Sequence, residues 1–90
     1  MAHVTFTRHL QRFFPTLAAG DVPGETVRAL VDELERRHPG FAGYVVDETG
    51  RLRRHVNVFV GDEPLRDRER LSDPVAADDK VFIMQALSGG

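Results

Sequence analysis

The stretch that decides the fold of this 90-residue chain runs from 26 to 40, Thr-Val-Arg-Ala-Leu-Val-Asp-Glu-Leu-Glu-Arg-Arg-His-Pro-Gly. Its apolar residues recur at i, i+3, i+4 and i+7, the spacing of one helical face: Val27, Leu30, Val31 and Leu34. Thr26 suits the cap at the start, and basic residues in the last turn suit the negative end of the helix dipole. Pro39-Gly40 then ends the element. The stretch predicts an amphipathic helix that buries one stripe.

Alternating apolar residues predict strands on either side of this helix. The clearest strand covers 55–60, where Val56, Val58 and Val60 share one face and His55, Asn57 and Phe59 share the other. The last strand covers 80–85, with Val81 and Ile83 on one face and Phe82 and Met84 on the opposite face. Residues 3–7 predict a first strand, 17–22 contain a weaker one, and 65–66 form a short edge segment.

The remaining segments are expected to connect these elements. Residues 9–15 are predicted to form a connection in which Phe13 and Phe14 cover one edge of the core. Phe41, Tyr44 and Val45 are expected to fold back over the helix end. Residues 47–50 favour a turn, and Leu71 is expected to anchor the charged stretch before it to the core.

One long helix and four or five strands predict a single α+β domain, with the helix packed across a mixed sheet. We place this domain at residues 1–86 and a flexible C-terminal tail at residues 87–90. Ninety residues suit one small domain.

Composition excludes several functional classes. The net charge of -2, with its signs interspersed, argues against a nucleic-acid surface. No apolar run is long enough to span a membrane and no signal peptide opens the chain, so we expect a cytoplasmic protein. The chain has no cysteine, which removes disulfides, thiolate nucleophiles and cysteine-based metal sites. Lys80 is the only lysine, against eleven arginines.

The chain closes on Ser88-Gly89-Gly90, and this tail is the candidate chemical site. Two glycines have no β-carbon and can pass through narrow channels that exclude other residues. A terminal carboxylate, ionised at neutral pH, is an oxygen nucleophile. Gly90, with Gly89 giving access to it, can therefore be activated inside a tight active site. The alternative is a frayed terminus without function.

Three segments together resemble the ThiS/MoaD family of small sulfur carriers. They are Gly24-Glu25-Thr26-Val27, the strand at 55–60 with the Gly61-Asp62-Glu63 that follows it, and 71–84 with the terminal glycines. The resemblance covers nearly the whole chain and implies the ubiquitin-like β-grasp fold. The extended centre at 50–59 looks most like the carriers of that family that serve cysteine biosynthesis. Molybdopterin-type carriers usually place two prolines before the glycines, where this chain has 85–88, Gln-Ala-Leu-Ser.

The resemblance implies a chemistry in which the chain is a co-substrate. An E1-like adenylating partner of the ThiF/MoeB type would use ATP to convert the Gly90 carboxylate into an acyl adenylate. A sulfur donor would then leave a thiocarboxylate there, for delivery to a sulfur-accepting synthase. The ATP chemistry must belong to the partner, because this chain has no glycine-rich phosphate loop with its lysine.

Three classes of function stay open. The first is the sulfur carrier, and the second is a ubiquitin-like modifier joined through Gly90 to lysines of target proteins. The third is an interaction domain with an inert tail. We expect no enzymatic activity, because the carboxylate pairs Asp47-Glu48 and Asp62-Glu63 both fall in predicted turns. We also expect no cofactor and no metal, since the four histidines lack ligand-like spacing.

A partner-docking patch is predicted on the sheet face opposite the helix. If the valines and Ile83 face the helix, Phe59, Phe82 and Met84 face away from it and form an apolar cluster. Arg53, Arg54 and Arg66 are candidates for its rim. The alternative is that the Phe13-Phe14 segment or the 41–44 segment folds across the three side chains and buries them.

Overall fold

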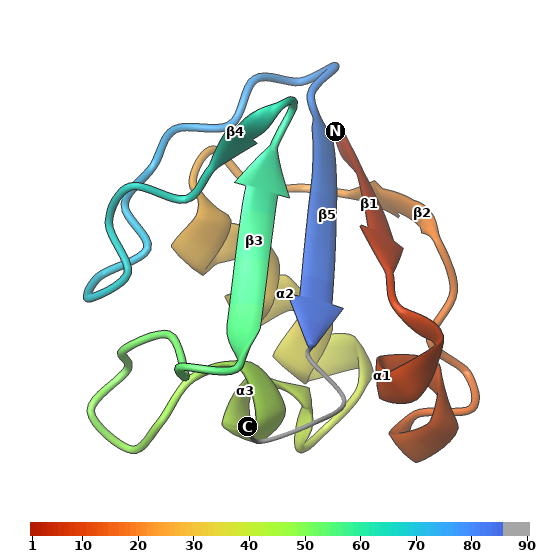
Figure 1. Ribbon diagram of the computed structural model, residues 1–90. Coiled ribbons are helices and arrows are strands. Elements are labelled where there is room, and N and C mark those ends of the chain that lie inside the picture. The colour runs from red at the N-terminus through yellow and green to blue at the C-terminus, as the bar shows by residue number, and fades with distance from the viewer. Residues whose placement is uncertain (86–90) are drawn as a thin grey trace.

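A mixed five-stranded sheet forms the centre of the computed structural model, which describes residues 1–85 (Figure 1). Its strands are β1 (Ala2–Phe6), β2 (Gly20–Val22), β3 (Val56–Val60), β4 (Glu63–Pro64) and β5 (Lys80–Gln85). The strand order is β2-β1-β5-β3-β4, with β5 parallel to β1 and antiparallel to β3. The predicted first, weak second, central and last strands are confirmed, and so is the α+β class.

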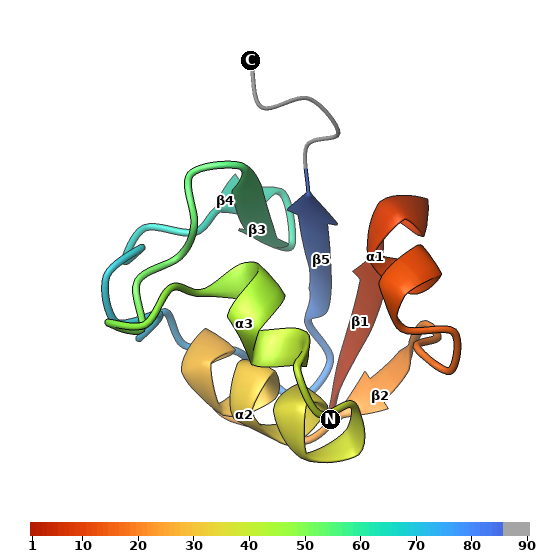
Figure 2. The ribbon, with the colours of Figure 1, turned by 90° about the horizontal axis from the view of Figure 1, so that it is seen from below.

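The long helix α2 (Val27–Arg37) packs across one face of this sheet, as its apolar stripe predicts (Figures 1 and 2). The four stripe residues are all buried, with Leu30 and Val31 fully so, against inward-facing residues of the sheet such as Val58 and Ile83. The predicted cap is confirmed, because the Thr26 hydroxyl oxygen accepts the Ala29 amide at 3.1 Å. Figure 2 shows α2 and α3 (Phe41–Val45) on the same side of the sheet, so the 41–45 segment does fold over the helix end.

Two local predictions are wrong. Residues 8–13 form a short helix, α1 (Arg8–Phe13), where a connection was predicted. Leu10 is its only buried residue, and the Phe14 amide bonds back to the Leu10 carbonyl at 3.2 Å. Six residues give too little periodicity to predict a helix, and so short a helix depends on tertiary packing for its stability.

The edge strand β4 begins two residues earlier than the predicted 65–66 segment. Val60 pairs directly with Glu63, so Gly61 and Asp62 make a two-residue turn and pairing resumes at once. Gly61 has a φ of 63°, the left-handed backbone that such hairpin turns require. Leu65 then leaves the edge to become a buried core residue.

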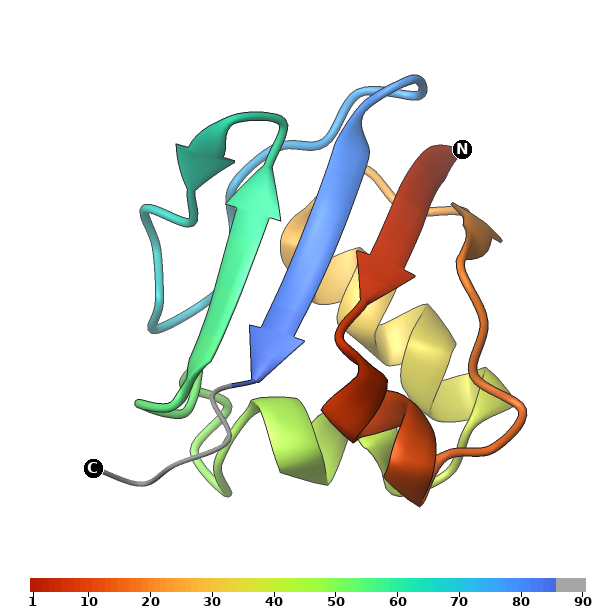
Figure 3. The same cartoon turned by 45° about the vertical axis from the view of Figure 1, so that its right-hand side comes forward.

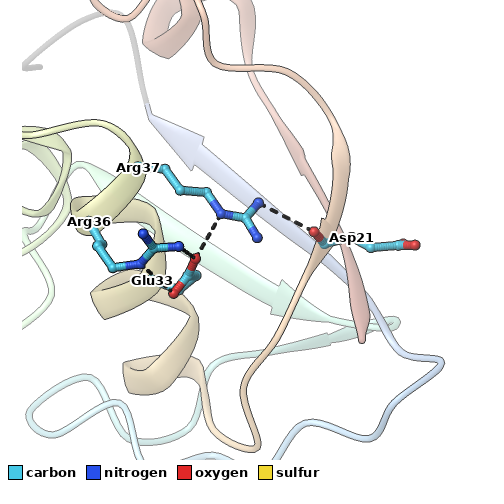
Figure 4. Close-up of polar contacts among 4 residues, drawn as sticks. All are labelled: Asp21, Glu33, Arg36 and Arg37. Atoms are coloured by element: carbon cyan, nitrogen blue, oxygen red, sulfur yellow. Dashed lines mark hydrogen bonds and ion pairs between the residues drawn. The ribbon is translucent and has the colours of Figure 1, made fainter.

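The end of α2 is tied to β2 through a carboxylate and two arginines (Figure 4). Glu33 accepts from Arg36 at 2.5 Å and from Arg37 at 2.8 Å, and these contacts lower the pKa of its carboxyl to about 2. Arg37 also donates to the Asp21 carbonyl of β2 at 3.4 Å. The basic last turn predicted from the helix dipole therefore also joins the helix to the sheet.

The loop at 65–75 accepts two further amides at the start of α2, beside the one that Thr26 caps. The first amides of a helix have no partner within it. Here the Val27 amide donates to the Asp73 carbonyl at 3.1 Å, and the Arg28 amide donates to the Leu71 carbonyl at 2.8 Å. Leu71 is fully buried and has a φ of 56°, the only left-handed non-glycine residue of the described chain. Its side chain anchors the loop as predicted, and its backbone turns the carbonyl toward the helix.

Asp67 holds this loop together, so replacing it should change the acid sensitivity of the fold. Its carboxylate accepts from the Ser72 hydroxyl at 2.5 Å and from the amides of 69, 70 and 72. The Ser72 bond is the main reason that its pKa falls to about 2. A lowered carboxyl pKa contributes stability above its unfolded value, and that stability is lost as pH falls through the folded value. Asp67→Asn should therefore unfold more readily at pH 7, and its difference from the parent should shrink between about pH 4 and pH 2.

Urea unfolding across that pH range measures the effect. Asp32→Asn is the matched control, because Asp32 is an exposed carboxylate on α2. If the difference in the free energy of unfolding between the parent and Asp67→Asn stays constant across this pH range, the assigned role of Asp67 is wrong.

Candidate functional site

β5, the strand that precedes the terminal glycines, is paired with a neighbouring strand on each side. Gly89 and Gly90 lie outside the described residues, as do the predicted boundary at residue 86 and the tail at 87–90. β5 pairs with β3 from Val81 to Gln85 and with β1 from Lys80 to Ile83 (Figure 3). Gln85, the last described residue, is thus fixed on a central strand at the end of the sheet near α1 and α3 (Figure 1). The last described residue before the glycines therefore belongs to a strand that pairs with two neighbours.

The predicted docking residues come together on the sheet face that α2 and α3 leave uncovered. Phe82 lies directly opposite Phe59, with Thr5 on its other side, and Met84 lies opposite Asn57. Phe59, Phe82 and Met84 are all half-buried, whereas Val81 and Ile83 on the other face are buried. The alternation predicted from the sequence is confirmed, and the docking role itself stays a prediction.

The aromatic residues that were alternative covers for this patch pack mainly against one another. Phe14 contacts Phe41 and Tyr44 at ring-centroid distances of 5.7 and 5.4 Å, and Phe13 contacts Tyr44 at 4.8 Å. Phe41 is fully buried and lies edge-on to Phe6 at 5.9 Å. These rings join α1 to α3 beside the end of the sheet, and Phe13 remains 48% exposed.

An open surface pocket of about 400 Å³ lies beside Gln85, and we call it the tail-root cavity. Its lining comes from α3 and the residue before it, from the segment before β3 and from β5: Gly40, Gly43, Tyr44, Arg53, His55 and Gln85. Two of these lining residues are bonded to each other, because Arg53 Nε donates to the Gly43 carbonyl at 2.9 Å. The Glu35 carboxylate accepts the amides of Gly40 and Ala42, which hold the start of α3 and lower the pKa of Glu35.

Gln85 was not singled out from the sequence, although a signal for it exists. It occupies the same inward parity on β5 as Val81 and Ile83, and a polar residue at an inward position needs a hydrogen-bond partner. It is the only buried polar side chain among the described residues, at 8% exposure, and its Oε1 finds no partner within residues 1–85.

Asp47 and two of the histidines, which were considered as site residues, contact other side chains of the described chain. Asp47 accepts the Thr49 amide and hydroxyl in the predicted turn, and this contact lowers its pKa. His3 lies 3.5 Å from Asp21, and His38 lies 3.2 Å from the Thr16 hydroxyl. Residues 1–85 contain no group of three or more side chains placed to hold a metal ion. Over the same residues, no helix has the length and apolar character needed to cross a membrane.

Comparison with known proteins identifies the family. The model of the ThiS family matches residues 7–90. The sulfur carrier protein CysO of Mycobacterium tuberculosis is 35% identical over 69 residues, which cover 74% of each chain. A chain of the BexX/CysO complex of Amycolatopsis orientalis superposes with a TM-score of 0.85 at 30% identity and covers both chains completely. SAMP1 from Haloferax volcanii superposes with a TM-score of 0.76 at 26% identity, over 99% of this chain and 98% of that one.

These matches span the sheet, the helices and the chain as far as Gly90, and they agree with the ubiquitin-like β-grasp fold that the resemblance implied. The chain therefore belongs to the ThiS family of small β-grasp sulfur carrier proteins, which are carriers and not enzymes.

Proposed function

We propose that this protein carries sulfur as a thiocarboxylate on Gly90. An E1-like adenylating enzyme of the ThiF/MoeB type transfers AMP from ATP to the Gly90 carboxylate and releases pyrophosphate. A sulfur donor then displaces AMP, so that a carbon–sulfur bond replaces the carbon–oxygen bond to phosphate. The sulfur of the thiocarboxylate bonds to the acceptor held by a sulfur-accepting synthase, and water then cleaves the bond between that sulfur and the Gly90 carbonyl carbon, which restores the Gly90 carboxylate.

One observation carries this proposal: the match to a family of sulfur carriers runs through Gly90, five residues beyond the end of the central strand. A carboxylate is a poor electrophile until one of its oxygens becomes a good leaving group, so an ATP-dependent partner is required. The similarity to CysO favours cysteine biosynthesis as the destination of the sulfur.

A ubiquitin-like modifier is the second candidate, and the similarity to SAMP1 supports it, since a solved structure of the Haloferax volcanii protein names it small archaeal modifier protein 1. Both candidates need the same adenylation of Gly90. They differ in the fate of the activated carbonyl, which goes to sulfide in the carrier and to a lysine amine in the modifier.

Intact-mass analysis of the protein, purified gently from its native cells, separates the two. A gain equal to the difference between one sulfur and one oxygen atom supports the carrier. A Gly-Gly remnant on lysines of other proteins, without that gain, supports the modifier. If neither species forms when the adenylating enzyme, ATP and a sulfide source are added to the purified chain, the proposal is wrong.

The same proposal assigns Phe59, Phe82 and Met84 to docking of the adenylating enzyme. Phe59→Asp places a charge within this patch, opposite Phe82, and should weaken binding to that enzyme by about 30-fold or more. Its melting temperature should stay near that of the parent, because Phe59 is half-buried on the face opposite α2. Calorimetric titration and thermal unfolding measure the two effects.

Ala18→Asp is the control, since it adds the same charge at an exposed position between α1 and β2. A large fall in the melting temperature of Phe59→Asp, or binding equal to that of the control, would show that Phe59 has no docking role.

A further inference from the structure

Phe13 is the only exposed phenylalanine or tyrosine side chain of the described residues. It is 48% exposed, and the only other large apolar side chain that is exposed among residues 1–85 is Met1. Single exposed apolar side chains are common on protein surfaces, so what Phe13 can do depends on where it lies and on how its ring is held.

Hydrogen bonds place α1, which carries Phe13, against the end of β5. The Thr7 amide donates to the Ile83 carbonyl at 3.3 Å, and the Gln85 amide donates to the Thr7 hydroxyl at 3.5 Å. α1 begins at the next residue, and Figures 1 and 3 show it beside the end of β5. The Phe13 ring contacts the Tyr44 ring, and Tyr44 lines the tail-root cavity together with Gln85. Phe13 therefore lies at the end of the sheet where β5 leads toward the terminal glycines.

The short stretch of chain between Gln85 and Gly90 brings any enzyme that acts on Gly90 close to this end. Five residues lead from Gln85 to Gly90, and they span at most about 18 Å when fully extended. Even a small protein domain is about 30 Å across, so an enzyme that encloses Gly90 in a channel is wider than this span. Its surface around the mouth of the channel therefore comes within reach of the side chains around Gln85, Phe13 among them.

The Phe13 ring is held in place by its neighbours in the free protein. The His9 ring lies edge-on to it at a centroid distance of 5.2 Å, and the Tyr44 ring packs against it at 4.8 Å. α1 itself is anchored by Leu10, its only buried residue. A side chain that is already ordered loses little conformational entropy on binding, and aromatic residues are enriched at protein interfaces. The exposed part of the Phe13 ring is thus a preformed apolar contact.

We propose that Phe13 is a docking residue for the enzyme that activates Gly90, and that its exposed ring enters an apolar pocket beside the channel that receives the tail. Phe13 lies at the end of the sheet, whereas Phe59, Phe82 and Met84 lie on its uncovered face. Contacts at both places fix the direction in which the last residues enter the channel. This inference rests on the proposed function for the identity of the partner.

The pair Phe13→Gln and Phe13→Leu tests this contact. Both variants place a good helix former at position 13 and remove the same ring contacts, so they differ mainly in the apolar surface that they offer. Affinity of the full chain for the adenylating enzyme is measured by calorimetric titration. It should fall about tenfold for Phe13→Gln and less than about threefold for Phe13→Leu. The urea midpoints of the two variants should lie close together, because position 13 is exposed.

Ala77→Gln and Ala77→Leu are the matched control, because Ala77 is exposed in the turn before β5, at the opposite end of the sheet. These two variants should bind the enzyme with equal affinity. Equal affinities of Phe13→Gln and Phe13→Leu would overturn the proposal. A urea midpoint of Phe13→Gln far below that of Phe13→Leu would also overturn it, because another part of the chain would then cover Phe13. A dimer of the parent that dissociates in Phe13→Gln, measured by sedimentation, would assign Phe13 instead to a contact between two copies.

The titrations are made without ATP, so their outcome is separate from that of the proposed function. An enzyme that binds the parent and discriminates between Phe13→Gln and Phe13→Leu, yet never adenylates Gly90, would refute the function and leave the docking residue. Equal adenylation of both variants at concentrations below their Kd would refute the docking residue and leave the function.

Discussion

A chain extended by one alanine after Gly90 is expected to lose activation by the adenylating enzyme, by about 100-fold or more. The extra residue moves the carboxylate by up to about 3.5 Å and places a β-carbon where the glycines have none. Small misplacements of a reacting group already carry large kinetic penalties. The fold should be unaffected, because the described core ends at Gln85.

Pyrophosphate exchange catalysed by the adenylating enzyme measures activation, and thermal unfolding checks the fold. The matched control adds one alanine before Met1, at the other end of the parallel β1–β5 pair, and should be activated like the parent. Full activation of the C-terminally extended chain would exclude Gly90 as the reacting group. Removing Gly89 and Gly90 addresses the third class, since an interaction domain with an inert tail would keep its activity.

Leu71→Ala should destabilise the protein by about 2–5 kcal/mol, the range for truncating a buried leucine. Leu71 is fully buried, and its carbonyl caps α2 through Arg28, so the lost packing loosens both the core and the start of the helix. Its φ of 56° also affects the free energy of unfolding, independently of the side-chain packing. Left-handed backbone costs a residue with a β-carbon roughly 1–2 kcal/mol, a cost that glycine avoids.

Leu71→Gly should therefore be at least as stable as Leu71→Ala in urea unfolding. Leu65 is the control, because it is also buried in the loop that caps α2 but has a negative φ. There glycine should be less stable than alanine by about 0.5–1 kcal/mol. The same order at both positions would mean that the backbone of Leu71 is not strained.

The sequence predicted those elements whose pattern repeats over several residues. α2 spans three turns with a cap and a stop, and apolar residues recur at every second position of β3 and β5. The approximate bounds and the buried faces of these three elements could therefore be predicted. α1 was missed because its six residues are held by Leu10 and by the contact of Phe14 with Phe41, 27 positions later. Such a contact has no local signature.

The part of the candidate site that lies on regular strands could also be predicted from the sequence. The alternation of β3 and β5 placed Phe59, Phe82 and Met84 on one face. The tail-root cavity, in contrast, depends on α3 lying beside the end of β5, with Arg53 bonded to the Gly43 carbonyl. Gln85 was not predicted as a site residue, because only the structure shows that its oxygen is buried without a donor among residues 1–85.

The parallel pairing of β1 with β5 has a practical consequence for labelling. His3 lies beside Lys80, so the amino-terminal group and the sole lysine share one pole of the molecule. Gln85 lies five residues along the strand from Lys80, about 17 Å away. Amine-reactive dyes and surface linkers will therefore attach at one pole only and leave the other facing solution. Every molecule immobilised in this way presents its carboxyl-terminal side to a partner in the same orientation.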